Sequence, residues 1–236
     1  MNIMIVACQT LREELRLAIK QTGMNYPVLY IESGLHNRPD SLHQEIQKNI
    51  DKIDNVDIVL MVFGYCGNSL LGIKSSQFKM VIPRVDDCIP LLLGSSAMRK
   101  EISMEMGTYF LTKGWLESEH NLLQEHERCV TRYGEQRALR VMRTMLGNYK
   151  RLMVIDTGAY STASLIPRTL EFSKKHDKRH EVVIGSLKLL HKLLLGPWDE
   201  EFIILEPGQE ITLDDIYSNS NDSGGAQLGS VGKEGR

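Results

Sequence analysis

The sequence lacks the short motifs that most often identify a protein's chemistry. It contains no G-x-G-x-x-G sequence and no phosphate-binding loop with its lysine, so no dinucleotide or nucleoside triphosphate site is indicated. There is no C-x-x-C pair among the four cysteines, which excludes the spacing of a zinc finger. No serine-histidine-aspartate or cysteine-histidine motif with family-type flanking residues is present. The chemistry must therefore be sought in residues that are distant along the chain.

The composition lacks the signs of several protein classes. The formal net charge of 236 residues is −2, which gives no general nucleic-acid footprint. No apolar run is long enough to cross a membrane, and the first residues lack the basic segment of a signal peptide. We therefore expect a cytoplasmic protein without a nucleic-acid or membrane partner. In a reducing compartment the cysteines are expected to be thiols and not disulfides.

Short apolar runs alternate with helical patterns through the first half of the chain. The pattern predicts parallel crossovers, and hence an α/β fold with an open, mostly parallel twisted sheet and helices on both faces, Rossmann-like and doubly wound. The second half is looser, with a long amphipathic helical region at residues 118–147 that bends near Gly134. The predicted strands cover residues 2–7, 27–31, 56–63, 79–83, 108–112, 151–155, 180–184 and 201–205.

The predicted domain organisation is simple. Residues 1–217 are expected to form a single α/β domain, which could consist of two half-domains that meet near residues 112–150. Residues 218–236 are rich in serine, glycine, asparagine and charged residues, and this composition cannot bury a core. We expect this segment to be a disordered tail that is dispensable for folding.

One stretch, residues 56–72, organises the rest of the prediction. Its apolar run reads as a buried central strand that stops at Gly64, and the following turn places Cys66 just beyond the strand's carboxyl end. Ligands of open α/β sheets bind at that edge. Cys8, His36 and Cys88 also follow predicted strands.

Parallel strands bring these four side chains to one edge, which predicts a metal site. Thiolate and imidazole are the ligands of zinc and other borderline-soft metals. Three thiolates with His36 would close a tetrahedral site, whereas three thiolates alone would leave a position for substrate, with His36 as a neighbouring base. The alternative is that each cysteine packs as a small buried hydrophobe, as free cysteines often do.

Three polar residues accompany the predicted ligands. Arg84 and Asp87 flank Cys88, and Asn68 follows Cys66. They could orient the metal ligands by hydrogen bonding to them, or bind an anion together with the exposed amides of the glycine turn. The alternative is a surface turn with an ion pair and a glycine turn without a ligand.

A set of short motifs runs along the chain, at residues 7–8, 34–37, 64–68, 83–89, 93–95, 107–115 and 207–208. Together they resemble an uncharacterised family of unknown function, family number 1638, of archaea and anaerobic bacteria. The resemblance covers nearly the whole chain except its tail, and the motifs are specific only in combination. This sequence has Met106 and Lys113 where the family pattern leads us to expect proline.

The resemblance implies a setting and not a catalytic residue, because similar proteins often accompany corrinoid-dependent methyltransferase systems. Our first hypothesis is a zinc-thiolate methyltransferase of one-carbon metabolism that acts on a small thiol with a corrinoid protein as partner. The second is a non-enzymatic accessory module that binds a metal, an iron–sulfur cluster or a corrinoid protein. The sequence does not decide between a catalytic protein and an accessory protein that only binds the metal, cluster or partner.

Overall fold

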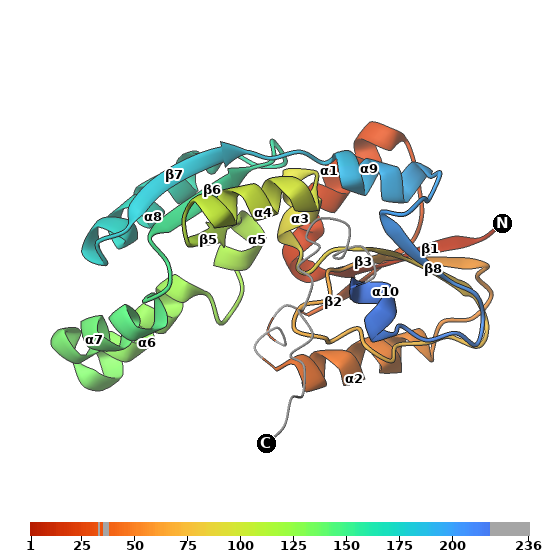
Figure 1. Ribbon diagram of the computed structural model, residues 1–236, viewed down its shortest axis with the longest axis horizontal. Coiled ribbons are helices and arrows are strands. Elements are labelled where there is room, and N and C mark those ends of the chain that lie inside the picture. Colours follow the sequence, from red (N-terminus) through yellow and green to blue (C-terminus); the bar gives the residue numbers. More distant parts are fainter. Residues whose placement is uncertain (33, 35–37, 218–236) are drawn as a thin grey trace, which may run out of the picture.

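The computed structural model describes residues 1–32, 34 and 38–217, and they form two lobes, each built on its own β-sheet (Figure 1). We call the lobe with the five-stranded sheet the large lobe and the lobe with the three-stranded sheet the small lobe. The strands of the large lobe are β1 (Ile3–Cys8), β2 (Val28–Ile31), β3 (Ile58–Val62), β4 (Lys79–Pro83) and β8 (Phe202–Leu205). Those of the small lobe are β5 (Thr108–Leu111), β6 (Arg151–Asp156) and β7 (Arg179–Ile184).

The large-lobe sheet has the strand order β2-β1-β3-β4-β8. Strands β1 to β4 are parallel, and β8 is antiparallel to β4. The central strand β3 consists of five apolar residues that are all buried, as expected of a strand covered by helices on both faces. This sheet therefore forms the main core of the molecule.

Helices cover both faces of the large-lobe sheet. Helices α1 and α9 lie together on one side and α2 lies on the other (Figure 1). Gly23 ends α1 in the left-handed conformation (φ 71°), which an L residue with a side chain adopts only at a cost. The helical elements of this lobe are η1 (Gln9–Leu11), α1 (Arg12–Thr22), α2 (Pro39–Ile50), α3 (Ile89–Leu93), α9 (Lys188–Leu195) and α10 (Leu213–Tyr217).

The small lobe has three parallel strands in the order β5-β6-β7. Helix α8 packs against β6 and β7, and α6 and α7 form a hairpin that projects from the lobe (Figure 1). Asn121 caps α6 by accepting hydrogen bonds from the backbone N–H groups of Leu123 and Gln124. The helical elements here are α4 (Ser96–Glu105), α5 (Lys113–Leu116), α6 (Leu122–Tyr133), α7 (Glu135–Met145), η3 (Thr162–Ser164) and α8 (Leu165–Lys175).

The α/β fold with mostly parallel strands is confirmed. The eight predicted strands are present, and Gly134 separates α6 from α7 where the sequence predicts a bend. The strands divide between two sheets because the chain leaves β4 through α3 and α4 and pairs β5 with β6. The predicted disordered tail lies outside the described residues. No helix within the described part of the chain is long and apolar enough to cross a membrane.

Candidate functional site

The carboxyl ends of the two sheets face each other, and we call the contact between them the seam. Gly114, at the start of α5, lies so close to η1 that an added Cβ would be 1.9 Å from the carbonyl oxygen of Thr10. Just after the carboxyl end of β7, the backbone N–H of Ser186 donates to the carbonyl of Leu92 in α3 (2.8 Å). Helices α1, α3 and α5 lie between the lobes in Figure 1. Such contacts between lobes are preferred places for ligand sites.

Three of the predicted ligands meet at the seam. Cys8 ends β1, Cys66 follows β3 and Cys88 follows β4, and these strands are adjacent and parallel. Burial raises the pKa of the Cys66 thiol to about 12, and the nearness of Cys8 adds to this rise. Burial also raises the pKa of Cys88 well above its usual value, with Cys66 and Cys8 as the next causes. The three thiols therefore lie close enough to affect one another's pKa, and they are protonated at neutral pH. His36 lies outside the described residues.

A pair of backbone hydrogen bonds holds the turn that carries Cys66. The N–H of Tyr65 donates to the carbonyl of Val85 (3.0 Å), and the N–H of Cys66 donates to that of Asp86 (3.0 Å). Gly64 is required for this close approach of the two loops, because an added Cβ would lie 2.2 Å from the backbone carbonyl carbon of Asp87. The loops after β3 and β4 are therefore joined backbone to backbone, which fixes Cys66 beside Cys88.

The turn also contains an unusual backbone conformation. Cys66 has φ 44°, and Gly67 and Asn68 follow with φ 71° and 69°. A side chain at positive φ is uncommon and strained outside glycine, and such residues cluster at ligand sites. The glycines of this motif are thus explained by geometry, whereas the left-handed Cys66 is a further sign of a functional site.

Cys8 is held by a neighbour from its own lobe. Its Sγ lies 2.9 Å from Oγ1 of Thr10, and burial raises the pKa of its thiol while Thr10 opposes the rise. A small cavity of about 130 Å³ opens between η1, α1 and α5, with Thr10, Arg12 and Gly114 in its wall. A cavity of this size and polarity can hold a few water molecules or a small polar group next to the site.

The structure places the three predicted accompanying residues differently. Asp87 lies with the thiols, since it contributes to the raised pKa of Cys66 and Cys88, and its Oδ2 accepts from Nη2 of Arg99 (3.0 Å). Arg84 donates to the backbone carbonyls of Glu200 and Asp215, so its guanidinium anchors the C-terminal segment. Asn68 is exposed in the turn.

The sequence analysis missed a buried carboxyl group at the seam. Glu14 of α1 is only 1% exposed, and burial raises its pKa to about 7, although its own backbone, Tyr160 and Thr157 oppose the rise. Tyr160 comes from the small lobe, where its hydroxyl accepts from the backbone N–H of Lys113 (3.1 Å). Glu14 also contributes to the raised pKa of Cys88. A carboxyl that is half ionised near neutral pH can exchange a proton with a neighbour.

Three buried polar atoms without a hydrogen-bond partner among the described residues belong to side chains at the seam. They are Nε of Arg12, Oε1 of Glu14 and Nε of Arg99. Such orphaned atoms are rare in folded proteins, and each calls for a partner such as a ligand, an ion or water. Their concentration beside three thiols supports a binding site at this place.

The described residues do not form a complete metal-coordination site. Among them, no three histidine, cysteine, aspartate or glutamate side chains are arranged so that they could hold a metal ion. The fourth predicted ligand, His36, falls in a part of the loop that the structure does not describe. What the structure assembles is a set of three neighbouring protonated thiols, with a buried carboxyl near one of them.

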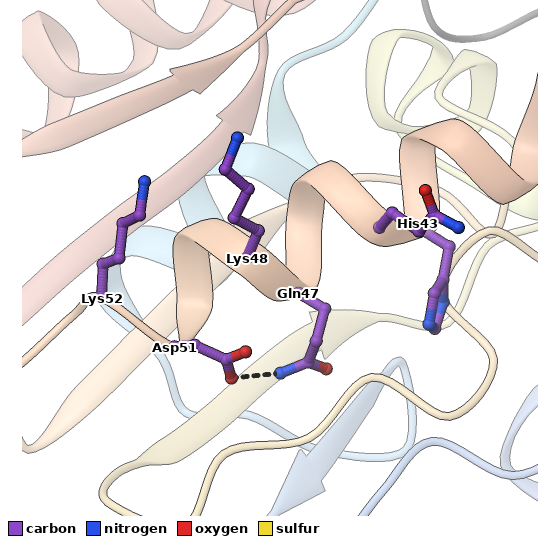
Figure 2. A pocket seen from close by; sticks show the side chains of 6 residues that line it. His43, Gln47, Lys48, Asp51 and Lys52 are labelled. Carbon is purple, nitrogen blue, oxygen red and sulfur yellow. Dashed lines mark hydrogen bonds between the residues drawn. The ribbon is translucent and has the colours of Figure 1, made fainter.

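A hollow elsewhere on the large lobe is less informative. Its six lining residues lie on α2 and the residues directly after it, and Figure 2 shows their side chains spread along the outside of the helix. Gln47 donates to Oδ1 of Asp51 (2.7 Å) along this surface. Gln47 also donates to the carbonyl of Lys74 (3.0 Å), and His43 bonds to that of Ser69 (3.2 Å), so this surface offers no convergent chemistry.

Comparison with known proteins gives a family. The model of a family described as "Protein of unknown function (DUF1638)" matches residues 30–194, which include Cys66 and Cys88 but not Cys8 or Glu14. The chain belongs to this family. Neither the curated proteins nor the solved structures give a match.

Proposed function

We propose that this chain binds a borderline-soft metal ion, zinc in the first place, through Cys8, Cys66 and Cys88 at the seam. The observation that supports this most is the meeting of three thiols from separate strand ends beside orphaned polar atoms. Sulfur is the donor that zinc and related metals select. A site that needs the folded sheet to assemble its ligands is typical of a functional centre more than of a structural clip.

Protonated thiols fit this proposal because a metal ion displaces their protons. Burial, with the neighbouring thiols and Asp87 adding to it, keeps the pKa of Cys66 and Cys88 high, so these sulfurs are neutral without a cation. A bound divalent ion supplies the positive charge that makes thiolates stable in the same surroundings. Metal uptake should therefore release protons and strengthen as the pH rises.

The chemistry that we propose for the centre is methyl transfer to a small thiol. Cys8, Cys66 and Cys88 would hold the ion, and zinc would supply the charge that keeps a substrate thiol deprotonated and nucleophilic. The methyl donor would be a methylated corrinoid held by a partner protein. The sulfur–carbon bond would form as the cobalt–carbon bond breaks, with both electrons of that bond left on cobalt. His36 would be either a fourth ligand that substrate displaces or a neighbouring base, and Asp87 would orient the ligands.

Elemental analysis of anaerobically purified protein tests the metal site. We expect about one zinc per chain, and serine at position 8, 66 or 88 should lower this content sharply because a hydroxyl is a poor soft-metal ligand. Cys129→Ser is the matched control, since Cys129 lies on α6 of the small lobe. Full zinc content in all three seam variants would contradict the proposal.

Two further measurements separate catalysis from carriage. X-ray absorption of the zinc protein should show a sulfur replacing a nitrogen or oxygen neighbour when a thiol substrate binds, and methylcobalamin with that thiol should lose its methyl group only when the protein is present. If neither occurs while the cysteines still hold metal, the accessory-module function is the better one. A brown protein with visible absorbance would indicate an iron–sulfur cluster instead of zinc.

A further inference from the structure

A second group of orphaned polar atoms lies in the small lobe, between α6 and α8. The ring of His126 is buried (6% exposed), and neither of its nitrogens has a hydrogen-bond partner among the described residues. Nε2 of His176 is in the same condition. The two rings pack edge to face with centroids 4.9 Å apart, so they do not satisfy each other. Like the unpartnered polar atoms at the seam, these buried imidazole nitrogens call for a hydrogen-bond partner such as a ligand or water.

His126 lies in the wall of a groove with a volume of about 500 Å³. This size falls within the usual range of small-molecule sites. The ring of Phe172 forms part of the wall and contacts His126 edge to face (centroids 5.8 Å apart). The groove therefore combines an apolar surface with a buried group that needs polar contacts.

The charges around the groove narrow the chemistry of its ligand. Lys175 and Glu135 form an ion pair with each other (2.7 Å). Arg168, Glu127 and Glu171 also line the groove, and the described residues give none of these three an ion-pair partner. All three side chains are exposed, and they would attract opposite groups of a ligand: Arg168 an anionic group, and the two carboxylates a cationic one. A molecule that carries both charges satisfies both sides.

The state of His126 adds to this argument. Burial, and then the charge of Lys175, lower its pKa, while Glu135 and Glu127 oppose that effect. At neutral pH its imidazole is uncharged, so one ring nitrogen donates a hydrogen bond and the other accepts one. A ligand that offers both an acceptor and a donor suits this ring.

We propose that the α6–α8 groove binds a free apolar α-amino acid. Arg168 would take its carboxylate, Glu127 and Glu171 its ammonium group, and Phe172 would contact its side chain, with His126 bonded to the polar end. Charge-assisted hydrogen bonds of this kind are among the strong ones in proteins. This site is separate from the thiol seam and does not rest on the function proposed for it.

Calorimetric titration of the full chain with L-leucine and with L-phenylalanine tests the proposal. We expect saturable binding of at least one of them, and a loss of about tenfold or more when the amino group is acetylated or the carboxylate is amidated. Arg168→Gln should weaken binding by a similar factor, because it removes the partner of the carboxylate. Its side chain is exposed, so this variant should fold normally.

Two controls isolate the groove. Lys174→Gln removes one positive charge from the exposed side of the same helix and should leave amino-acid binding unchanged. Cys66→Ser should also leave it unchanged, because that thiol belongs to the seam. The proposal is overturned if neither amino acid binds at millimolar concentration, if both blocked derivatives bind as well as the free amino acid, or if Lys174→Gln weakens binding as much as Arg168→Gln.

Discussion

The large lobe buries a carboxyl group at the carboxyl edge of its sheet, whereas the small lobe packs a buried imidazole, His126, against the half-buried imidazole of His176. Burial disfavours the charged form of each, so it raises the pKa of Glu14 to about 7 and lowers that of His176 to about 4. The two lobes are therefore sensitive to opposite changes of pH. Alkaline conditions place a charge in the seam, and acidic conditions place charges beneath α6.

The two sheets differ in a way that explains which lobe carries the thiols. All five residues of β3 are buried, and its neighbours on both sides are strands. In β7, by contrast, Val182 and Ile184 are 45% and 83% exposed. A sheet covered on both faces holds the loops at its carboxyl edge rigidly, which a precise cluster of side chains requires. The small lobe contributes the surface that closes over this edge.

The largest expected effect comes from separating the lobes. An alanine at position 114 would place its Cβ 1.9 Å from the Thr10 carbonyl oxygen, and backbone on both sides prevents an easy adjustment. We expect Gly114→Ala to lower the free energy of unfolding by about 3 kcal/mol. Urea unfolding measures this change. Gly34→Ala is the control, since its Cβ would meet no atom of the described residues within 4 Å, and equal effects of the two substitutions would contradict a tight seam.

The second prediction concerns the alkaline side of the comparison. The pKa of Glu14 is raised on folding, so its contribution to stability is complete below about pH 4.5 and is lost as the pH rises through 7. Glu14→Gln should therefore be more stable than the natural protein at pH 8.5, by up to about 3 kcal/mol, and nearly equal to it at pH 4.5. Denaturant unfolding across this range provides the measurement.

Glu13→Gln is the matched control for Glu14. Its carboxylate lies next to Glu14 on α1 but forms a surface ion pair with Arg16 (3.4 Å). Surface pairs of this kind contribute little, so this variant should keep the pH profile of the natural protein. An unchanged profile in Glu14→Gln as well would show that the buried carboxyl does not govern stability.

The smallest expected effect lies on the acidic side, in the small lobe. The pKa of His176 is lowered by burial and then by His126, Lys175 and Lys178, with Glu135 opposing them. Its contribution to stability is complete above about pH 6.5 and is lost as the pH falls toward 4. Between pH 7 and 4.5, the melting temperature of His176→Gln should therefore fall by less than that of the natural protein.

Thermal unfolding followed by circular dichroism tests this third prediction. His191→Gln serves as the control, because His191 hydrogen-bonds to Gln21 at the surface of the large lobe (2.8 Å). It should keep the acid sensitivity of the natural chain. The same loss of melting temperature in all three proteins would show that the buried imidazole pair is not the cause.

The sequence predicts the strands well because their apolar runs are short and bounded by turn residues. It also predicts which cysteines meet, since Cys8, Cys66 and Cys88 each follow a strand and parallel strands share an edge. Cys129 follows no strand and lies on α6 of the small lobe. The pairing of eight strands into two sheets is not encoded in any single run, because it depends on which distant strand each one meets.

The sequence could not reveal Glu14 and its surroundings. Glu13 and Glu14 occupy the first turn of α1, where acidic residues are ordinary because they favour the positive end of the helix dipole. Only the seating of the small lobe, with Tyr160, buries one of the two. The left-handed backbone of Cys66 is equally invisible in sequence, because glycine and not cysteine is the residue that signals positive φ.

The distribution of the four cysteines gives the molecule internal reporters of unfolding. Cys8 is buried (1% exposed) in the large-lobe sheet, whereas Cys129 lies on α6 in the projecting hairpin of the small lobe. Regions of one protein open with different free energies, and a fully buried thiol such as Cys8 reacts with an alkylating reagent only when its region is open. The rate at which Cys8 becomes labelled in rising urea thus records the opening of the large lobe, with the half-buried Cys129 as a reference that needs less opening.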